Sequence, residues 1–391
     1  MSKISPILRE WEAVIGLEAH AQLSTRTKMF CSCLNAYGDP PNTHTCPVCL
    51  GLPGSLPVPN ARAIEYALRL GVALGCEITP FSRFARKNYF YPDLPKGYQI
   101  SQYEEPLCRG GSVKIRLGGS TKEIPLIRIH LEEDAGKSIH AHRDNGTAVD
   151  FNRCGVPLVE IVTEPVIRTP LEARVYLSTL KQILQYLDIC DCNMEEGNLR
   201  CDANISVRPR GKSVMGTKTE MKNLNSFRSV ERGLEYEIER QAGLLKKGEK
   251  VDHVTLLWNE ELRKAEVMRT KEEAHDYRYF PDPDLVPVTV SEKRLSEIRA
   301  ALPELPHERE ERLVKEFALR LEDVLILTSD PGFADYFEEA VDLGADPKEA
   351  SKWMVGEVTR ILKEKSWEME AFPVRPDRFV ALLDSVRKKD V

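Results

Sequence analysis

Residues 13–23 read A-V-I-G-L-E-A-H-A-Q-L, with apolar residues at every second position. Side chains of a β-strand alternate between two faces, so this period of two predicts a strand with one buried face. The opposite face carries Glu18 and His20 side by side. Similar alternation over residues 127–134, 200–208 and 218–222 predicts more strands with charged residues on one face. The chain therefore starts as a sheet with a polar second face.

Three helices are predicted within this sheet-forming region. Residues 60–74 and 226–245 carry apolar residues at helical spacing, and T-P-L-E at 169–172 is a capping box that opens the third helix. The proline-rich stretch F-P-D-P-D-L-V-P-V at 280–288 ends the pattern, and helical spacing follows it from Ser291 onward. The fold class expected is α+β: a body over residues 1–288 with a mixed or antiparallel sheet, then a small all-α domain over residues 289–391.

Composition excludes several classes of protein. The chain has 391 residues, 42% hydrophobic and 30% charged, which is typical of a globular protein and not of a disordered one. The net charge of −6 comes from residues 291–391, so neither part is the basic body of a nonspecific nucleic-acid binder. No apolar run is long enough to span a membrane, and the start M-S-K-I-S-P lacks the apolar core of a signal peptide. We expect a cytoplasmic protein.

Two close pairs of cysteines form the sharpest local motif: C-S-C at 31–33 and C-P-V-C at 46–49. Four thiolates at this spacing predict a structural Zn²⁺ knuckle in loop 31–49, with Cys31, Cys33, Cys46 and Cys49 as ligands. Free thiols in a small core are the alternative. A redox dithiol is disfavoured because no βαβ context surrounds the motif. Cys201, further along, is expected to be a small core residue of its strand.

Carboxylates on the predicted strand faces suggest a second kind of site. In P-L-V-E-I-V-T-E at 157–164, Glu160 lies among apolar residues, where an ionised carboxylate is costly unless it is paired or bound to metal. Without a cation, burial is expected to raise the pKa of Glu160. If the polar faces converge, oxygen-rich ligation with a histidine favours Mg²⁺ or Mn²⁺, and interleaved Lys and Arg would hold phosphates. A solvated face of mixed charge remains the alternative for any single strand.

Residues 86–103, R-K-N-Y-F-Y-P-D-L-P-K-G-Y-Q-I-S-Q-Y, are expected to form a polar-aromatic loop. Its tyrosines and cations suit stacking on a base and contact with phosphate. A turn-rich connection whose tyrosine rings simply pack is an equal alternative. The sequence contains neither a G-x-x-x-x-G-K-[ST] loop nor a G-x-G-x-x-G fingerprint, so the site would differ from a P-loop or kinase nucleotide site.

Taken together, these strings resemble the GatB family, the B subunits of the tRNA-dependent aspartyl/glutamyl-tRNA(Asn/Gln) amidotransferases. The resemblance covers residues 12–290. It is carried by V-I-G-L-E-A-H-A-Q-L, the C-S-C…C-P-V-C pair, R-K-N-Y-F-Y-P-D-L-P-K-G-Y-Q-I-S-Q-Y, H-L-E-E-D-A-G-K, D-F-N-R-C-G-V-P-L-V-E-I-V-T-E-P and M-E-E-G-N-L-R-C-D-A-N-I-S-V-R with K-N-L-N-S-F.

The resemblance implies a cradle-shaped body that uses ATP and Mg²⁺ to phosphorylate the side-chain carboxylate of Glu or Asp misacylated on tRNA. Ammonia then displaces the phosphate, giving Gln-tRNA or Asn-tRNA. It also implies an amidase partner (GatA type) that hydrolyses glutamine to supply the ammonia, a polar channel, and a small clamp protein (GatC type). The implied metal ligands are Glu18, His20, Glu132 and Glu160.

Other positions acquire roles from the same resemblance. Asp202 and Glu220 resemble a neighbouring acidic site, Lys87 is the candidate contact to the γ-phosphate, and Tyr89 and Tyr91 join it in the expected nucleotide site. Family members usually continue into a further helical tail, and the chain ends at Val391, so this tail domain is expected to be absent. Glu-tRNA and Asp-tRNA are not distinguished by the sequence. A zinc-stabilised, non-catalytic tRNA-binding adaptor for a partner amidase is the alternative function.

Overall fold

The computed structural model describes residues 6–140, 146–270 and 276–389. The first five residues, part of the stretch used above to argue against a signal peptide, and the final Val391 lie outside this range. Contacts divide the chain into two compact units. The first comprises residues up to 184 and 188–302, and the second comprises 185–187 and residues from 303 onward.

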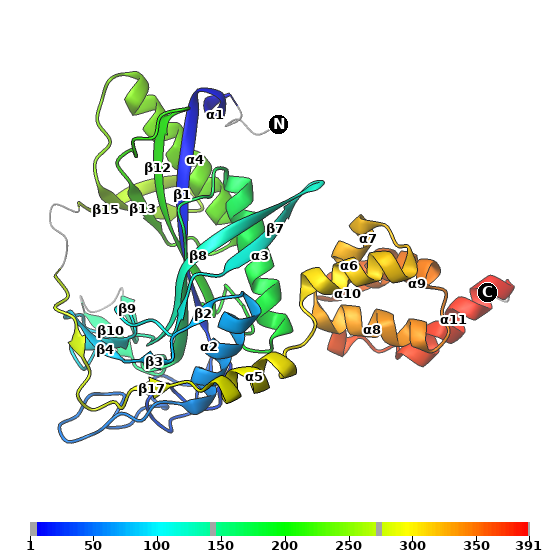
Figure 1. The fold of residues 1–391 in the computed structure, drawn as a ribbon, viewed down its shortest axis with the longest axis horizontal. Helices are drawn as coiled ribbons and strands as arrows, with labels where there is room; N and C mark the ends of the chain where they lie inside the picture. The colour runs from blue at the N-terminus through cyan, green and yellow to red at the C-terminus, as the bar shows by residue number, and fades with distance from the viewer. Residues whose placement is uncertain (1–5, 141–145, 271–275, 390–391) are drawn as a thin grey trace. The chain divides into compact units, whose positions relative to one another are not determined.

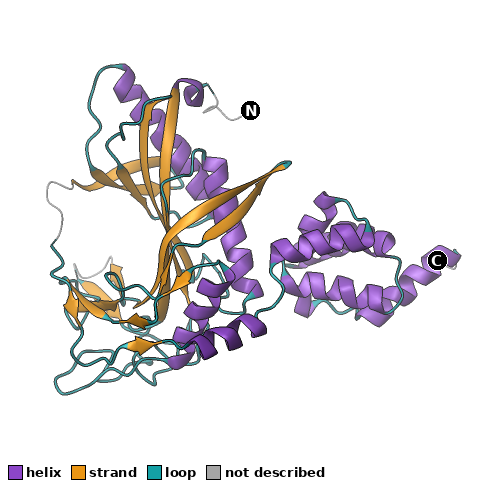
Figure 2. Ribbon diagram, viewed as in Figure 1, coloured by secondary structure: helices purple, strands orange, loops and turns teal. Residues whose placement is uncertain are grey.

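A large mixed sheet forms the centre of the first unit (Figures 1 and 2). Its described strands are β1 (Trp11–Gln22), β2 (Glu77–Ile78), β4 (Ala85–Asn88), β5 (Tyr98–Ser101), β6 (Cys108–Arg109), β7 (Ser112–Leu117), β8 (Ser120–Glu133), β11 (Pro157–Thr163), β12 (Leu199–Pro209), β13 (Thr219–Lys222), β14 (Val254–Asn259), β15 (Lys264–Thr270) and β16 (Phe280–Pro281). The main path runs β15-β14-β13-β12-β1-β11-β8-β5-β4-β16. All its pairs are antiparallel except β13 with β14, so the predicted mixed α+β class is confirmed.

Two small ribbons flank this sheet: β9 (Lys137–His140) pairs with β10 (Thr147–Asp150), and β3 (Phe81–Ser82) pairs with β17 (Val288–Thr289). The helices of the first unit are α1 (Ile7–Glu10), α2 (Ala61–Ala73), α3 (Pro170–Tyr186), α4 (Phe227–Lys246) and α5 (Glu292–Ala301). The last residues of α3, from Gln185, group with the second unit.

The three helices predicted in the body form where expected, because their caps are present. Asn60 accepts hydrogen bonds from the backbone at the start of α2, and Ser226 does the same for α4. At α3, the Thr169 hydroxyl accepts from the Glu172 N–H at 3.1 Å. The Glu172 carboxylate departs from a standard capping box, because it accepts from the Arg168 N–H at 2.8 Å instead of reaching back to Thr169.

Burial follows the alternation that predicted the sheet. In β1, one face is closed to solvent: Ala13, Ile15, Leu17, Ala19 and Ala21 are at most 1% exposed. Helix α4 packs against β12 and buries Leu234 and Ile238. Burial of these side chains is the main favourable term that holds helices to sheet. The opposite face of β1, with Glu18 and His20, is only partly covered.

The second unit is all-helical. It contains α6 (Pro306–Phe317), α7 (Leu321–Leu327), α8 (Pro331–Asp342), α9 (Pro347–Trp353), α10 (Thr359–Lys365) and α11 (Pro376–Lys388), with a π-helical turn at Met354–Val358 and a 3₁₀ turn at Met369–Ala371. Its core centres on Leu313, Phe337 and Met354, which are fully buried. Helix α5, which the sequence assigned to this domain, belongs to the first unit, because it packs on α2 and Arg294 pairs with Glu65 at 3.0 Å.

Candidate functional site

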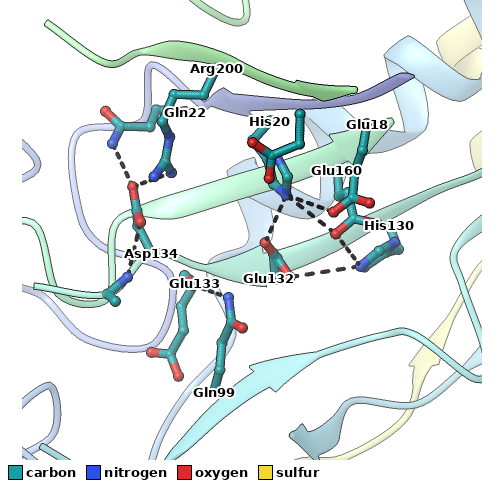
Figure 3. A network of polar contacts seen from close by, with 12 residues as sticks. Glu18, His20, Gln22, Gln99, His130, Glu132, Glu133, Asp134, Glu160 and Arg200 are labelled. Atoms are coloured by element: carbon teal, nitrogen blue, oxygen red, sulfur yellow. Dashed lines mark hydrogen bonds and ion pairs between the residues drawn. The ribbon is translucent and has the colours of Figure 1, made fainter. Parts of the chain in front are cut away.

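The register of three neighbouring strands gathers the predicted carboxylates. In the pairing of β1 with β11, His20 lies opposite Glu160, and in the pairing of β11 with β8, Glu160 lies opposite His130. These three side chains therefore form a row across the polar face of the sheet. Glu18 and Glu132 project from the same face, one row away on either side. Figure 3 shows the five side chains pointing toward one another.

The His20 imidazole stands at the centre of the four residues expected to hold Mg²⁺. Its Nε2 is 3.4 Å from Glu160 Oε2, 3.5 Å from Glu18 Oε1 and 3.9 Å from Glu132 Oε1. The possible ligand atoms of Glu18, His20 and Glu160 lie within 4.8 Å of one another. Such a group of carboxylate oxygens and one imidazole fits a hard divalent cation. Residues taken from strands far apart in sequence thus meet in one place.

Two neighbours of this cluster were not among the predicted site residues. His130 lies with its Nε2 3.8 Å from Glu132 Oε2 and 3.8 Å from Glu160 Oε2. Arg128 places its Nη2 3.1 Å from Glu160 Oε1. Both residues precede Glu132 at intervals of two along β8, so strand alternation alone places them on the face that carries Glu132.

The pKa of Glu160 contradicts the expectation that it rises in the absence of a cation. Burial does act to raise it, but the charges of His130, His20 and Arg128 and the hydrogen bond from His20 together hold the pKa below its usual range. The expectation was wrong because it considered only the apolar sequence neighbours of Glu160. Side chains from the adjacent strands supply the positive charge that the local sequence does not show.

The pKa values of Glu18 and His20 are raised instead. Burial and the charge of Glu160 raise the pKa of Glu18. For His20, burial lowers the pKa, but the hydrogen bond with Glu160 and the charges of Glu132, Glu160 and Glu18 outweigh burial and raise it to about 9. A proton on His20 therefore provides positive charge among three carboxylates in the metal-free protein. A divalent cation would take over that role and leave the imidazole neutral as a ligand.

Asp202 and Glu220 form a separate acidic group beside the cluster. Asp202 lies opposite Glu18 in the register of β12 with β1. Lys222 contacts the Asp202 carboxylate closely and lies 2.9 Å from Glu220 Oε1. Burial lowers the pKa of Lys222, but both carboxylates outweigh burial and raise it. The two acids predicted as a second site are thus held together by a lysine from β13.

A cavity of about 1090 Å³ opens beside the acidic group, and Asp202 and Lys222 are among its lining residues. Gln22 and Arg200 also line it, together with residues 35–39, residues 194–198 and Asn223–Asn225. Asp134 fixes the wall, because its carboxylate accepts hydrogen bonds from Gln22 at 2.8 Å and from Arg200 at 2.6 Å (Figure 3). The volume reaches the upper end of the range for small-molecule sites, roughly 300–1,000 Å³.

The polar-aromatic segment is more regular than expected at both ends. Its flanks form β4 and β5, which pair with Lys87 opposite Gln99. The Lys87 Nζ lies 4.8 Å from the ring centroid of Tyr277 and 5.8 Å from that of Tyr89. Tyr89 is half-buried, and burial together with nearby carboxylates such as Glu132 raises its pKa. Tyr91 is 60% exposed. Of the residues predicted to bind the nucleotide, Lys87 therefore lies on a paired strand and Tyr91 lies at the surface.

The four cysteines of the knuckle come together. The Sγ atoms of Cys31, Cys33, Cys46 and Cys49 all lie within 4.8 Å of one another. The Cys46 and Cys49 sulfurs are 3.9 Å apart, and the Cys46 N–H donates to Cys49 Sγ at 3.2 Å. Four convergent thiols of this kind can hold a structural metal ion.

A buried lysine lies beside the cysteine cluster. Lys28 is fully buried, and its Nζ donates to the His44 carbonyl at 2.6 Å and lies 3.9 Å from Cys49 Sγ. A hydrogen bond with Cys31 makes the largest contribution to lowering the pKa of Cys49, and the Lys28 charge lowers it further. Together these effects outweigh burial, which raises the pKa, and the resulting pKa is about 5. One thiol is therefore poised as a thiolate, which is the form that binds metal.

Comparison with known families defines the class of protein. Residues 13–296 match the model of the GatB/GatE catalytic domain, and residues 335–391 match the model of the GatB domain. The chain therefore belongs to the GatB/GatE family, as the sequence motifs predicted. The first match includes the residues of both the acidic cluster and the cysteine cluster.

Within that family, three similar relatives are each named as the B subunit of an aspartyl/glutamyl-tRNA(Asn/Gln) amidotransferase. The relative from Thermodesulfovibrio yellowstonii is 54% identical over 379 residues, covering 97% of this chain and 80% of its own. Those from Thermoanaerobacter pseudethanolicus and Moorella thermoacetica are 54% and 53% identical, covering 96% of this chain and 78% and 79% of their own. The chain is thus a member of the GatB branch, whose named members are subunits of ligase-type amidotransferases. Among the described residues, no helix is long and apolar enough to cross a membrane.

Proposed function

We propose that this chain is the component of a tRNA-dependent amidotransferase that activates the misacylated amino acid. A side-chain carboxylate oxygen of Glu or Asp on the tRNA attacks the γ-phosphorus of ATP, and ADP leaves. Ammonia then attacks the acyl carbon, and phosphate leaves to give Gln-tRNA or Asn-tRNA. The ammonia comes from glutamine hydrolysed by a partner amidase of the GatA type, and a small clamp protein of the GatC type joins the pair.

The observation that carries this proposal is the cluster of Glu18, His20, Glu132 and Glu160. Asp202, which lies opposite Glu18 on the neighbouring strand, lines the cavity. The four cluster residues fit a Mg²⁺ ion, because buried carboxylates repel one another and the pKa of His20 is raised in its absence. When bound, Mg²⁺ would neutralise charge that builds up on phosphoryl oxygens. The chain's part is to hold the ligands on rigid neighbouring strands, which fixes their geometry before the reaction.

The cationic residues near the cavity are assigned to anionic parts of the substrates. Arg200 and Lys222 line it directly. Lys87, which lies on β4 beside Tyr277 and is not among the lining residues, is the candidate contact to the γ-phosphate. Asp202 and Glu220 orient Lys222 rather than bind phosphate themselves, since like charges repel. The cysteine cluster is assigned a structural Zn²⁺, which has no catalytic part because its four positions are filled by thiolates.

The test is ATP hydrolysis by the purified complex in the presence of misacylated tRNA. We expect ADP release that depends on Glu-tRNA or Asp-tRNA and on Mg²⁺, with correctly charged Gln-tRNA as the control. Separate assays with each misacylated tRNA identify the substrate. If no tRNA-dependent ATP hydrolysis occurs even with the amidase partner present, the chain is a zinc-stabilised tRNA-binding adaptor and this proposal fails.

A further inference from the structure

Glu133 is a buried carboxylate that the proposed function does not use. It follows Glu132 as the last residue of β8, and its side chain is directed away from the acidic cluster because successive side chains of a strand alternate (Figure 3). Glu133 is 2% exposed, and the side chain of its partner Lys96 is 7% exposed. The Lys96 ammonium contacts Glu133 Oε1 directly. Two opposite charges are therefore buried as a pair, one residue away from a candidate Mg²⁺ ligand.

Glu133 also holds the neighbouring strand. Its Oε1 accepts a hydrogen bond from the Ile100 N–H at 3.0 Å, and its backbone carbonyl accepts one from Gln99 Nε2 at 2.8 Å (Figure 3). Strands β5 and β8 pair at the next position, where Ser101 lies opposite Glu132. The end of β8 that carries Glu132 is thus fixed on β5 by contacts that converge on Glu133.

The cysteine cluster packs against this buried pair from one side. Gly51, two residues after Cys49, has a φ of +67°, and a Cβ at Gly51 would lie 2.5 Å from Lys96 Cγ. Gly155 lies between the cysteines and the carboxylate, because a Cβ there would be 3.5 Å from Cys49 Cβ and 3.9 Å from Glu133 Oε2. The backbone after the last cysteine is therefore in close contact with Lys96, and a single glycine separates Cys49 from Glu133.

The segment that carries the four cysteines has little regular structure of its own. Residues 23–60, all of which the structure describes, contain no helix or strand apart from one isolated bridge between Thr27 and Leu34. Ordering such a segment costs conformational entropy, and a metal ion bound by four of its side chains offsets that cost. Removal of the ion should therefore loosen the contact of Gly51 with Lys96.

We infer that the zinc site positions Glu132 through the buried Lys96–Glu133 pair. Gly51 holds Lys96 in place, Lys96 pairs with Glu133, and Glu133 fixes the end of β8 on β5. Lys96 and Glu133 are positioning residues, since they act on the acidic cluster only through Glu132. The role of Glu132 as a metal ligand rests on the proposed function, but the effect of zinc on the end of β8 does not.

Hydrogen exchange followed by mass spectrometry tests this inference without any assay of activity. The full chain is compared with zinc bound and after a chelator has removed the zinc in reducing buffer. We expect zinc removal to speed exchange roughly tenfold or more at residues 97–101 and 129–133, while β14 keeps its protection. Faster exchange confined to residues 23–60 would overturn the inference, because zinc would then order only its own loop. Loss of protection throughout the body, β14 included, would also overturn it.

A double variant, Lys96→Met with Glu133→Gln, tests the path between the two sites. It removes both buried charges together, so neither is left unpaired, and Gln still offers an acceptor to the Ile100 N–H. In the wild-type chain, zinc removal should weaken Mn²⁺ binding by about tenfold or more, the usual scale for residues that support a metal ligand. The double variant should retain zinc, bind Mn²⁺ with the same weakened affinity, and lose no more when zinc is removed. A zinc effect as large as in the wild type would overturn the inference.

Arg294→Gln is the control for this titration. It removes a partly exposed ion pair with Glu65, 3.0 Å long, and should change neither the Mn²⁺ affinity nor its response to zinc. If the zinc-loaded wild type binds no Mn²⁺, the metal assignment of the proposed function fails, and the exchange measurement alone decides the present inference. If Mn²⁺ binds equally well with and without zinc, the inference fails and the proposed function stands.

Discussion

Replacing Glu160 with Gln tests the electrostatics of the site in the metal-free protein. The variant keeps the shape of the side chain and removes a charge that lies 3.1 Å from Arg128 Nη2 and 3.4 Å from His20 Nε2. Because Glu160 is 7% exposed and its pKa lies below the usual range, the carboxylate stabilises the folded state at neutral pH. We therefore expect a loss of stability. The raised pKa that the apolar sequence neighbours alone predicted would instead make the substitution neutral or slightly stabilising.

The magnitude follows from the burial of the pair. Breaking a buried ion pair by removing one partner costs about 3–5 kcal/mol. Gln still accepts a hydrogen bond and the Arg128 side chain is 18% exposed, so we expect about 2–3 kcal/mol here. For a unit of this size that is a fall in melting temperature of roughly 5–10 °C. The measurement is a thermal melt of the body's transition, followed by circular dichroism, without added Mg²⁺.

Glu123→Gln, on the neighbouring strand β8, is the matched control. Glu123 is exposed and lies 3.9 Å from Lys114, so its loss should change stability by less than about 1 kcal/mol. With Mg²⁺ and ATP, the Glu160 variant should also lose on the order of 10² in amidation rate, the scale of one preorganised electrostatic contact. If it melts at the same temperature as the Glu123 variant, the ion-pair account of this cluster is wrong.

Three further predictions concern His20 and the cysteine cluster. His20→Ala should impair Mg²⁺ binding and tRNA amidation while glutamine hydrolysis by the partner is largely retained; normal amidation of both misacylated tRNAs would exclude His20 as a ligand. The folded-state pKa of His20, about 9, is above its unfolded value of roughly 6.5. The stability that protonated His20 contributes is therefore complete below about pH 6.5 and is lost as the pH rises through 9. Chemical denaturation of the metal-free protein between about pH 6 and about pH 9.5 measures this loss. Cys46→Ser should reduce bound zinc, from about one ion per chain, to substoichiometric levels in elemental analysis; zinc-free wild-type protein prepared without chelators would leave four ordinary thiols.

Much of the fold could be predicted from the sequence because its signals are local. Alternation over residues 13–23 fixed which face of β1 is buried, and caps such as Asn60 and Ser226 fixed where helices begin. The boundary of the helical unit was harder to predict from the sequence. A proline-rich segment marks a break in regular structure, but only packing of α5 on α2 decides to which unit that helix belongs.

The candidate site could also be predicted from the sequence only in part. Strand alternation placed Glu18 beside His20 on one face, and it also carried the information that His130 and Arg128 share a face with Glu132. What alternation cannot give is register between strands. His20 lies opposite Glu160 only because β1 and β11 pair at that offset, and the sign of the Glu160 pKa shift depends on that pairing. Charge compensation from a neighbouring strand is a long-range property that a local pattern does not contain.

Transfer of oxygen from the amino acid to phosphate tests the central claim most directly. The complex is given Glu-tRNA or Asp-tRNA labelled with ¹⁸O in the side-chain carboxylate, together with ATP, Mg²⁺ and glutamine, and the released phosphate is analysed by mass spectrometry. If the carboxylate attacks the γ-phosphorus and ammonia then displaces phosphate, each phosphate released with amidation carries one labelled oxygen. Unlabelled phosphate accompanying full conversion to Gln-tRNA or Asn-tRNA would contradict activation by phosphorylation.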